Sequence, residues 1–437
     1  MEKVLNPPRL QGVVGAPSSK SEAHRALIVA ALKALYGGSA STVRIRCTHL
    51  NEDIEATIRC LNALGAIIRR EGEALVVTPI TKIPTHPVLD CGESGSTLRF
   101  LLPVCCALGA VPGAPEDFTA SLIGHGRLPQ RPLSPLYEEL VAHGAILSPT
   151  GSNPLVVQGK LTAGDYALDG DVSSQFISGL LFALPLLEKN STLAVTGKIE
   201  SAPYIHMTLD ALSLVTESIE GELPAFTIAG RSEGPAPDVD ADGFFVGGDW
   251  SGAAFFLTAG VLGGAGTSIT LTGLSTASRQ GDKAILTVLR DMGGNIREAD
   301  NGDIIAYPSR LRGMEINAAQ IPDLVPILAV AASVAEGDTR IVGASRLRLK
   351  ESDRLQTVTA MLTALGGDVT ETADGLIIRG VPRLVGGTVD AAGDHRIAMS
   401  GAVASLVCDG SVTVTGAECV AKSYPSFWEE FERLTER

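Results

Sequence analysis

The chain has 437 residues, of which 45% are apolar, and it carries a formal net charge of −14 with a sequence pI near 5.0. A chain of this length can bury a large core and favours two domains over one. The acidic balance argues against nucleic acid as the main partner, because phosphate backbones are bound by a surplus of lysine and arginine.

A short loop rich in Gly, Ser and Asp runs into an apolar helix at intervals of roughly 75 residues. The six loops begin at Pro17, Cys91, Gly170, Gly248, Ile321 and Gly393. Small residues at a helix start leave backbone N–H groups accessible at the positive end of the helix dipole, so each start is a candidate seat for an anion. Six seats brought together would bind a ligand with several negative charges.

A second predicted helix follows in each interval, and several of these helices end at a glycine. The predicted helices span 51–68, 134–147, 202–215, 281–296, 351–369 and 424–434. Glycine is the usual left-handed stop of a helix, and the β-rich runs that follow, such as 74–77 and 375–378, indicate strands. We therefore predict six α/β repeats, three per domain. An α/β alternation without true repetition is the alternative.

The cysteines and the apolar segments exclude several classes of protein. The seven cysteines show no CxxC spacing, which indicates free thiols in a reducing cytoplasm, and no histidine pair forms a metalloprotease motif, so no metal is expected. The most apolar stretch, 100–114, is broken by proline and glycine, and the N-terminus lacks a hydrophobic signal region. A cytoplasmic protein without a membrane span is expected.

Eight cations lie in these small-residue loops or within one turn after them. A cation near a helix N-terminus is repelled by the dipole unless an anion is present, so eight of them favour an anion site over isolated surface charges. They are Lys20, Arg25, Arg99, Arg127, Arg131, Arg354, Arg396 and Lys422.

Carboxylates are interleaved with the cations. Asp323 begins an apolar helix predicted over 324–335, and Glu351 lies in the run Lys350 to Arg354. Either carboxylate alone could simply cap a helix or favour its first turn. Among several cations, however, a carboxylate stays ionised and can act as a base. The sequence offers both proton-transfer roles without assigning them.

Seven separated motifs together resemble one known family. The chain resembles the 5-enolpyruvylshikimate-3-phosphate synthases (3-phosphoshikimate 1-carboxyvinyltransferases) over its whole length, in the family's order and spacing. The motifs are 19–21 with Arg25, 94–99, 127–132, 172–176, 350–354, 394–396 and 422–425.

The resemblance implies a two-lobed, inside-out α/β barrel of six βαβαββ-like repeats, three per lobe. One lobe would comprise residues 19–246 and carry most contacts to shikimate 3-phosphate. The other would combine residues 1–18 with 247–437. The helix N-termini would point toward a cleft between the lobes, which ligand binding would draw together.

The implied reaction transfers the enolpyruvyl group of phosphoenolpyruvate to the 5-hydroxyl of shikimate 3-phosphate and releases phosphate, with no cofactor and in a monomer. By resemblance, shikimate 3-phosphate contacts Lys20, Ser21, Arg25, Ser173, Ser174, Gln175, Ser201, Tyr204, Asp323 and Lys350. Phosphoenolpyruvate contacts Lys20, Gly95, Arg127, Gln175, Arg354, Arg396 and Lys422. Asp323 would be the base on the hydroxyl, with Glu351 and Lys20 as candidates for the other proton transfers. Gly95 would face the pocket that also takes the herbicide glyphosate.

Three positions depart from the family pattern. Glu93 stands where Asn is common, Phe100 where Pro is common, and Arg346 where an Asn often contacts substrate. A carboxylate about 4 Å from an anionic ligand would be repelled by roughly 4 kcal/mol at an effective dielectric of about 20. We therefore expect Glu93 to turn away from the ligand or to pair with an arginine.

Three other protein classes could share this pattern. The enolpyruvyl transferases of UDP-N-acetylglucosamine share the six-unit fold but carry a reactive cysteine on a loop, whereas the segment 111–127 has none here. Cys105 and Cys106 lie in an apolar helix and are expected in the core. A non-catalytic phosphometabolite-binding protein would gain nothing from carboxylates in its pocket. An RNA-processing enzyme of related fold would show a basic face, which the sequence lacks.

Overall fold

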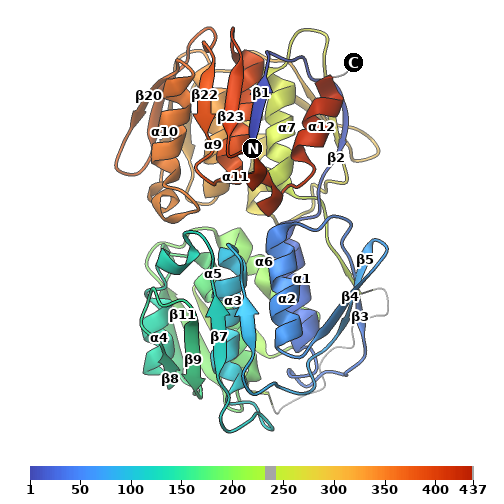
Figure 1. Cartoon of the computed structure of the whole chain (residues 1–437), viewed down its shortest axis with the longest axis vertical. Coiled ribbons are helices and arrows are strands. Elements are labelled where there is room, and N and C mark those ends of the chain that lie inside the picture. Colours follow the sequence, from blue (N-terminus) through green and yellow to red (C-terminus); the bar gives the residue numbers. More distant parts are fainter. Residues whose placement is uncertain (232–242, 436–437) are drawn as a thin grey trace. The chain divides into compact units, whose positions relative to one another are not determined.

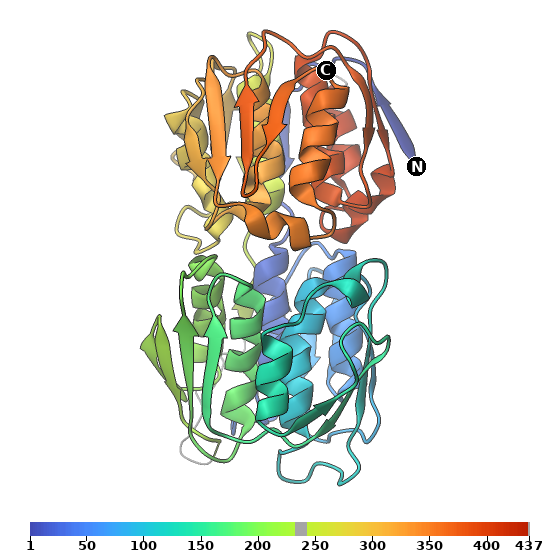
Figure 2. The same ribbon diagram turned by 90° about the vertical axis from the view of Figure 1, so that its left-hand side faces the viewer.

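The computed structural model describes residues 1–231 and 243–435, and the chain divides into two compact units. The N-terminal unit is Lys20–Val246, and the C-terminal unit combines Met1–Ser19 with Gly247–Arg437. The expected division at 19–246 differs from this one by a single residue. Each unit is described separately below (Figures 1 and 2).

The strands of the described residues form six sheets, three in each unit. The pattern is clearest in the sheet of β6 (Val88–Asp90), β7 (Ala120–Ile123), β9 (Leu155–Gly159) and β8 (Ala145–Leu147). Here β6 runs parallel to β7, and β9 pairs antiparallel with both β7 and β8. A helix joins β6 to β7, a second helix joins β7 to β8, and a hairpin joins β8 to β9, which is the βαβαββ repeat that the sequence predicts.

The other two sheets of the N-terminal unit follow the same order. One contains β10 (Asp165–Asp169), β11 (Ser191–Thr196), β13 (Ala225–Ile228) and β12 (Ile219–Glu222). The other contains β14 (Phe244–Phe245), β3 (Val43–Arg46), β5 (Ala74–Thr78) and β4 (Ile67–Glu71).

The C-terminal unit has two four-stranded sheets and one of three strands. The first joins β16 (Asn295–Glu298), β17 (Ile304–Tyr307), β15 (Ile269–Thr272) and β2 (Gly12–Gly15). The second joins β18 (Glu315–Asn317), β19 (Asp338–Val342), β21 (Leu376–Arg379) and β20 (Asp368–Glu371). In the third, β1 (Glu2–Leu5) pairs antiparallel with β23 (Val412–Thr415), which runs parallel to β22 (Gly387–Asp390).

The two crossover segments exchange edge strands between repeats. Strand β2 directly precedes helix α1 along the chain, yet it pairs with β15, while β14 directly precedes α7 and pairs with β3. The Ser19 N–H donates to the Gly247 carbonyl at 2.8 Å, and the Asp249 N–H donates to the Pro17 carbonyl at 2.7 Å. Pairing of the crossover segments therefore fixes the start of α7.

Three nearly buried helices form the centre of each unit. In the N-terminal unit they are α1 (Lys20–Leu32), α3 (Gly95–Leu108) and α5 (Ser174–Ala183), and in the C-terminal unit α7 (Trp250–Leu262), α9 (Val325–Ser333) and α11 (His395–Ala404). The strands alternate buried and exposed residues, as in β10, so each sheet turns one face to the helices and one to solvent. This is the inside-out α/β arrangement expected from the sequence. The six helices expose side chains almost only in their first turns.

The second helix of each repeat buries only one face. These helices are α2 (Glu52–Ala63), α4 (Leu136–Ala142), α6 (Ala202–Ser213), α8 (Ile285–Asp291), α10 (Arg354–Ala364) and α12 (Phe427–Thr435). The predicted ranges were too long, because 51–68, 134–147, 281–296 and 351–369 each run into the next strand. Glycines with positive φ, such as Gly65 at 104° and Gly366 at 84°, end the helices earlier.

Candidate functional site

Lys20 and Asp53 pair at the first turns of α1 and α2 in the N-terminal unit. Lys20 is the first residue of α1, and its Nζ donates to Asp53 Oδ2 at 2.9 Å. Both side chains are largely buried, with 17% and 13% exposed. Asp53 supplies an anion that offsets the repulsion between the Lys20 charge and the helix dipole. In the sequence, Asp53 is one of three acidic residues in the first turn of α2, and nothing there distinguishes it as a site residue.

Arg25 joins α1 to α6. It donates to Thr208 Oγ1 at 2.8 Å, to the Ser21 carbonyl at 2.7 Å and to the Tyr204 carbonyl at 2.8 Å. Its guanidinium also lies over the Phe100 ring, 5.1 Å from the centroid, and burial lowers its pKa to about 10. Arg25 therefore positions Ser21 and Tyr204, two other predicted site residues. Ser201, directly before α6, has a left-handed backbone with φ of 56°.

A polar chain links the first turns of α3 and α5. Arg99 Nη1 donates to Gln175 Oε1 at 3.0 Å, and Gln175 Nε2 donates to Ser96 Oγ at 2.9 Å. Ser173 caps α5 by accepting the Gln175 N–H at 3.3 Å, and Ser174 is the first residue of that helix. The predicted residues Ser173, Ser174 and Gln175 thus lie beside Arg99.

Gly95 lies against two guanidinium groups. A Cβ at this position would be 2.7 Å from Arg131 Nη1 and 3.0 Å from Arg99 Nη1. The absence of a side chain lets both cations approach the first turn of α3, where N–H groups already favour an anion. Both arginines are among the eight loop cations, and the family resemblance assigns neither to a ligand. Arg127 lies directly before a short 3₁₀ turn, Leu128–Gln130.

A chain of buried hydroxyls supports the same helix starts. His24 Nδ1 lies 2.7 Å from Thr57 Oγ1. Thr57 Oγ1 in turn lies 2.7 Å from Thr97 Oγ1, and Thr97 Oγ1 donates to Ser94 Oγ at 2.8 Å. Burial lowers the pKa of His24 well below its usual value, and Lys20 and Arg25 lower it further, so the ring is neutral. Ser94 in turn caps α3. No local sequence signal reveals this chain, because its members come from three helices.

Asp323 is the centre of a charge cluster in the C-terminal unit. Its carboxylate accepts from Arg354 Nη1 at 2.7 Å and from Arg396 Nη2 at 3.1 Å, and Lys350 Nζ lies 3.6 Å away. Asp323 lies within a 3₁₀ turn, Pro322–Leu324. The residue at the N-cap position of this turn is Ile321, and no side chain makes a capping hydrogen bond there. The capping interpretation of Asp323 is therefore wrong, since the carboxylate is committed to the cations.

Arg354 is buried among three carboxylates. Besides Asp323, it donates from Nη2 to Glu351 Oε2 at 2.7 Å and from Nε to Asp394 Oδ2 at 2.8 Å. Burial opposes its charge, but Asp394, Glu351 and Asp323 together raise its pKa above the usual value. Asp353 caps α10, and Glu351 lies before this cap. Glu351 is therefore not a residue of the first helical turn, which was one of its two interpretations from sequence.

The remaining predicted residues of the C-terminal unit lie at the edge of this cluster. Burial lowers the pKa of Lys350 to about 8, against the opposing effect of Asp323. Lys422 Nζ donates to the Gly393 carbonyl at 2.8 Å, just before Asp394 caps α11. Arg346 donates to the Ala319 carbonyl at 3.0 Å.

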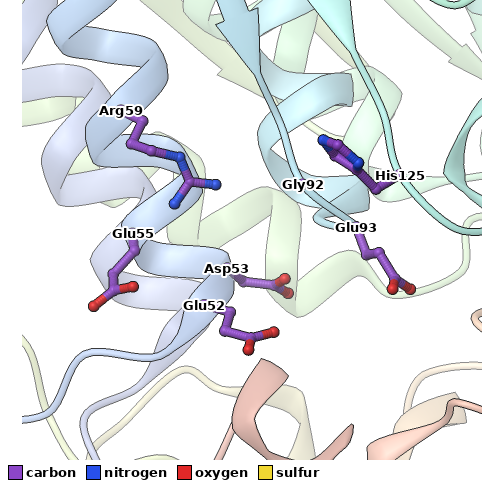
Figure 3. Close-up of a pocket in the computed structure, with 7 residues that line it drawn as sticks. All are labelled: Glu52, Asp53, Glu55, Arg59, Gly92, Glu93 and His125. Carbon is purple, nitrogen blue, oxygen red and sulfur yellow. The ribbon is translucent and has the colours of Figure 1, made fainter.

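One pocket of about 310 Å³ in the N-terminal unit lies beside the Lys20–Asp53 pair (Figure 3). Four carboxylates line it, which makes it a poor seat for an anion. Its lining residues are Glu52, Asp53, Glu55, Arg59, Gly92, Glu93 and His125. The Glu93 carboxyl carbon would lie 2.7 Å from a Cβ placed on Gly126, so this side chain packs against the Gly126 backbone.

One family model covers nearly the whole chain. A model described as EPSP synthase (3-phosphoshikimate 1-carboxyvinyltransferase) matches residues 4–431. The chain belongs to the EPSP synthase family.

Relatives and solved structures are similar along the whole chain. The 3-phosphoshikimate 1-carboxyvinyltransferase of Clostridium kluyveri is 42% identical over 98% of this chain and 96% of its own length. That of Clostridium perfringens is 40% identical over 99% of this chain and 98% of its own. An EPSP synthase structure from Acinetobacter baumannii aligns with a TM-score of 0.77 at 26% identity, covering 99% of this chain and 98% of that one.

The fold is also found in another enolpyruvyl transferase. The enolpyruvyl transferase NikO of Streptomyces tendae, at 20% identity and a TM-score of 0.74, shares the fold. Cys105 and Cys106 are buried in α3, as expected, and burial raises the pKa of both thiols. No helix among residues 1–231 and 243–435 is both long and apolar enough to cross a bilayer.

Proposed function

We propose that this chain transfers the enolpyruvyl group of phosphoenolpyruvate to the 5-hydroxyl of shikimate 3-phosphate and releases phosphate. The observation that supports it most is Asp323, a carboxylate in contact with Arg354 and Arg396 and close to Lys350. A protein that only bound anions would gain nothing from this carboxylate, whereas a transferase needs a base beside its anion-binding groups.

The substrates would be shared between the polar clusters of the two units. Shikimate 3-phosphate would contact Lys20, Ser21, Arg25, Ser173, Ser174, Gln175, Ser201 and Tyr204 of the N-terminal unit and Asp323 and Lys350 of the C-terminal unit. Phosphoenolpyruvate would contact Lys20, Gly95, Arg127 and Gln175 together with Arg354, Arg396 and Lys422. The arginine forks can bind its carboxylate and phosphate through paired hydrogen bonds, which fixes orientation as well as charge.

The chemistry proceeds by addition and elimination. Asp323 accepts the proton of the 5-hydroxyl as its oxygen attacks carbon 2 of phosphoenolpyruvate, while an acid delivers a proton to carbon 3. The tetrahedral adduct then loses a proton from carbon 3 and expels phosphate, which restores the double bond. Glu351 and Lys20 are the candidates for the carbon 3 and leaving-group protons. The arginines stabilise the negative charge on phosphate in both steps.

The proposal takes the chain to act as a monomer in the cytoplasm on small anions. The net charge of −14 supports small-molecule partners over nucleic acid, because phosphate backbones are bound by a surplus of lysine and arginine.

A phosphate-release assay tests the proposed function. Purified protein should release phosphate from phosphoenolpyruvate only when shikimate 3-phosphate is present, without added metal. The same assay with UDP-N-acetylglucosamine as the acceptor is the control and should give no release. Turnover with that acceptor, or release without any acceptor, would contradict the assignment.

A further inference from the structure

Asp282 is a fully buried carboxylate that has no part in the mechanism above. It lies in the 3₁₀ turn Gly281–Ala284, which packs against the start of α7, and its side chain is 0% exposed. Ser251 Oγ, in the first turn of α7, donates to its Oδ2. Its other oxygen, Oδ1, is buried and accepts no hydrogen bond within the described part of the chain. A buried carboxylate oxygen without a donor is costly, which suggests that a donor arrives in another state of the protein.

Arg396 offers the complementary group. Two of its nitrogens donate to Asp323, Nη1 to the carbonyl and Nη2 to the carboxylate, but its buried Nε donates to nothing among the described residues. The Arg396 charge acts to lower the pKa of Asp282, and the Asp282 charge acts to raise the pKa of Arg396. The turn that holds Asp282 and the helix that holds Arg396 both pack against α7, so one donor and one acceptor of opposite charge, each unpaired among the described residues, lie at the same helix.

The charged groups around Asp282 come from three other elements. Asp249 caps α7, Asp323 lies in the turn before α9, and Arg396 lies in the first turn of α11. Asp249 and Asp323 disfavour a charge on Asp282, whereas Arg396 and the Ser251 hydroxyl favour it. Asp323, Asp282 and Asp249 all act to raise the pKa of Arg396, so the three carboxylates attract the same guanidinium.

We propose that Asp282 is a positioning residue whose free Oδ1 accepts the Arg396 Nε–H when a substrate anion binds, so that Arg396 releases the Asp323 carboxylate. The inference rests on the proposed function, in which Asp323 must be free to accept a proton. Without Asp282, Arg396 would remain on Asp323 and hold the base in its ion pair.

This role requires Asp282 to be ionised. Burial, followed by the Asp323 charge, raises its pKa to about 6. Above this pH the carboxylate can draw Arg396 away from Asp323, and as the pH falls through it the carboxyl group becomes neutral and loses that pull. The wild type should then behave like a protein that lacks the charge at position 282.

The test compares kcat/KM for phosphoenolpyruvate in wild type and Asp282→Asn between pH 5 and 8. We expect a ratio of wild type to variant of about 10 or more at pH 8, as for a hydrogen bond to a charged group, that falls toward 1 below about pH 6. The ratio cancels the titration of the substrate itself. A ratio that does not change with pH would reduce Asp282 to a structural role, and a variant faster than wild type at pH 8 would overturn the proposal.

Gln280→Ala is the matched control. Gln280 is also buried, and it anchors the same turn by accepting the Trp250 N–H at 3.0 Å and donating to the Gly248 carbonyl at 2.9 Å. Its loss should lower stability and kcat/KM without a pH-dependent ratio, because no titrating charge is removed. A pH-dependent ratio in this variant would count against a specific role for Asp282.

Two further measurements protect the test. If Asp282→Asn does not fold, Ser251→Ala can replace it, because this variant removes the hydroxyl that favours the charged form of Asp282. The fall of kcat/KM on the acid side should then occur at higher pH than in the wild type. An unchanged position of this fall would refute the inference. Calorimetry with inorganic phosphate gives the wild-type to variant ratio of affinities without turnover. If the ratio of phosphate affinities depends on pH but the protein shows no enolpyruvyl transfer, only the proposed function is rejected. If the ratio of phosphate affinities does not depend on pH, the role of Asp282 is rejected.

Discussion

At the scale of single residues, Asp323 shows what a carboxylate gains from its neighbours. From sequence it could be a helix cap or a base, and both readings fit an aspartate behind Pro322. Its bonds to Arg354 and Arg396, together with the nearby Lys350, support an ionised carboxylate instead of a cap. These cations come from residues 27 to 73 positions later in the chain.

Replacing Asp323 tests its role as a base. We expect Asp323→Asn to lower kcat by roughly 10²-fold or more while changing substrate affinity much less, because a general base acts mainly in the transition state. Steady-state kinetics with both substrates gives the split. Asp338→Asn, which breaks an exposed pair with Arg379, is the control and should leave kcat unchanged. Near-normal kcat in Asp323→Asn would remove this residue from the catalytic step.

Gly95 is a second position where one atom should matter. A methyl group there would meet the Arg131 and Arg99 guanidinium groups, which must shift to accept it. We expect Gly95→Ala to weaken binding of phosphoenolpyruvate and glyphosate by roughly 5- to 150-fold, with the larger loss for glyphosate, because overpacking costs about 1–3 kcal/mol. KM values and inhibition constants measure both effects.

Gly264→Ala is the control for this substitution. The nearest atom to a Cβ at Gly264 is Arg9 Nε at 3.6 Å, so a methyl group fits without displacement. This variant should keep both constants. An unchanged glyphosate inhibition constant in Gly95→Ala would show that Gly95 does not line the ligand pocket.

At the scale of elements, capping modifies the simple picture of six anion seats. Side chains at the cap positions of α3, α5, α7 and α11, four of the six loop starts, each accept one first-turn N–H, and so does the cap of α10. The caps are Ser94, Ser173, Asp249, Asp353 and Asp394. The residues that made the loops polar therefore satisfy part of the helix ends themselves, and the arginines carry most of the capacity to bind anions.

Two of these caps differ in burial, so comparing them separates the contribution of capping to stability from the contribution of a buried ion pair. Asp394 is fully buried and accepts from Arg354 and from the Arg396 N–H, whereas Asp353 is partly exposed and pairs with Arg348. We expect Asp394→Asn to cost about 3–5 kcal/mol of unfolding free energy, because it breaks a buried ion pair. Asp353→Asn, the control, should cost about 1 kcal/mol or less. Equal costs in denaturant unfolding would contradict this prediction.

The pH dependence of this difference has a defined sign. Burial opposes the charge of Asp394, but Arg354 outweighs it and holds the pKa of the carboxyl below its usual value. The stability from Asp394 should therefore be complete above the unfolded pKa of about 3.9 and lost as the pH falls through the lower folded value.

At the scale of the whole molecule, the described part of the chain builds six similar α/β repeats, three in each unit. Strand β2 pairs within the C-terminal unit and β14 within the N-terminal unit, and the chain passes between the units directly after each of these segments. The proposed contacts of shikimate 3-phosphate fall in both units, so this ligand should favour whichever arrangement satisfies both sets of contacts.

We predict that saturating shikimate 3-phosphate lowers the radius of gyration in X-ray scattering. The physical reason is the higher affinity of an arrangement in which both units contact the ligand. Lys350→Ala, which removes a proposed contact from the C-terminal unit alone, should require more ligand for the same change. A radius that stays constant at saturation would argue against ligand-driven closure.

The sequence by itself determined the repeat, the helix stops and the family. Glycines such as Gly65 and Gly366 end helices through a local backbone preference, and six apolar helices must be buried wherever they lie, so both signals are readable without coordinates. Helix lengths were overestimated, because the apolar pattern continues across these glycines into the next strand.

Only the tertiary structure decided which charges meet. Asp394 binds Arg354 from 40 positions away, and the His24 to Ser94 hydroxyl chain crosses three helices, so neither has a local signature. The unpaired Oδ1 of Asp282 and Nε of Arg396 likewise appear only when the helix starts are packed together. Pairing of charges depends on distance and burial in space, and the order of residues along a chain specifies neither.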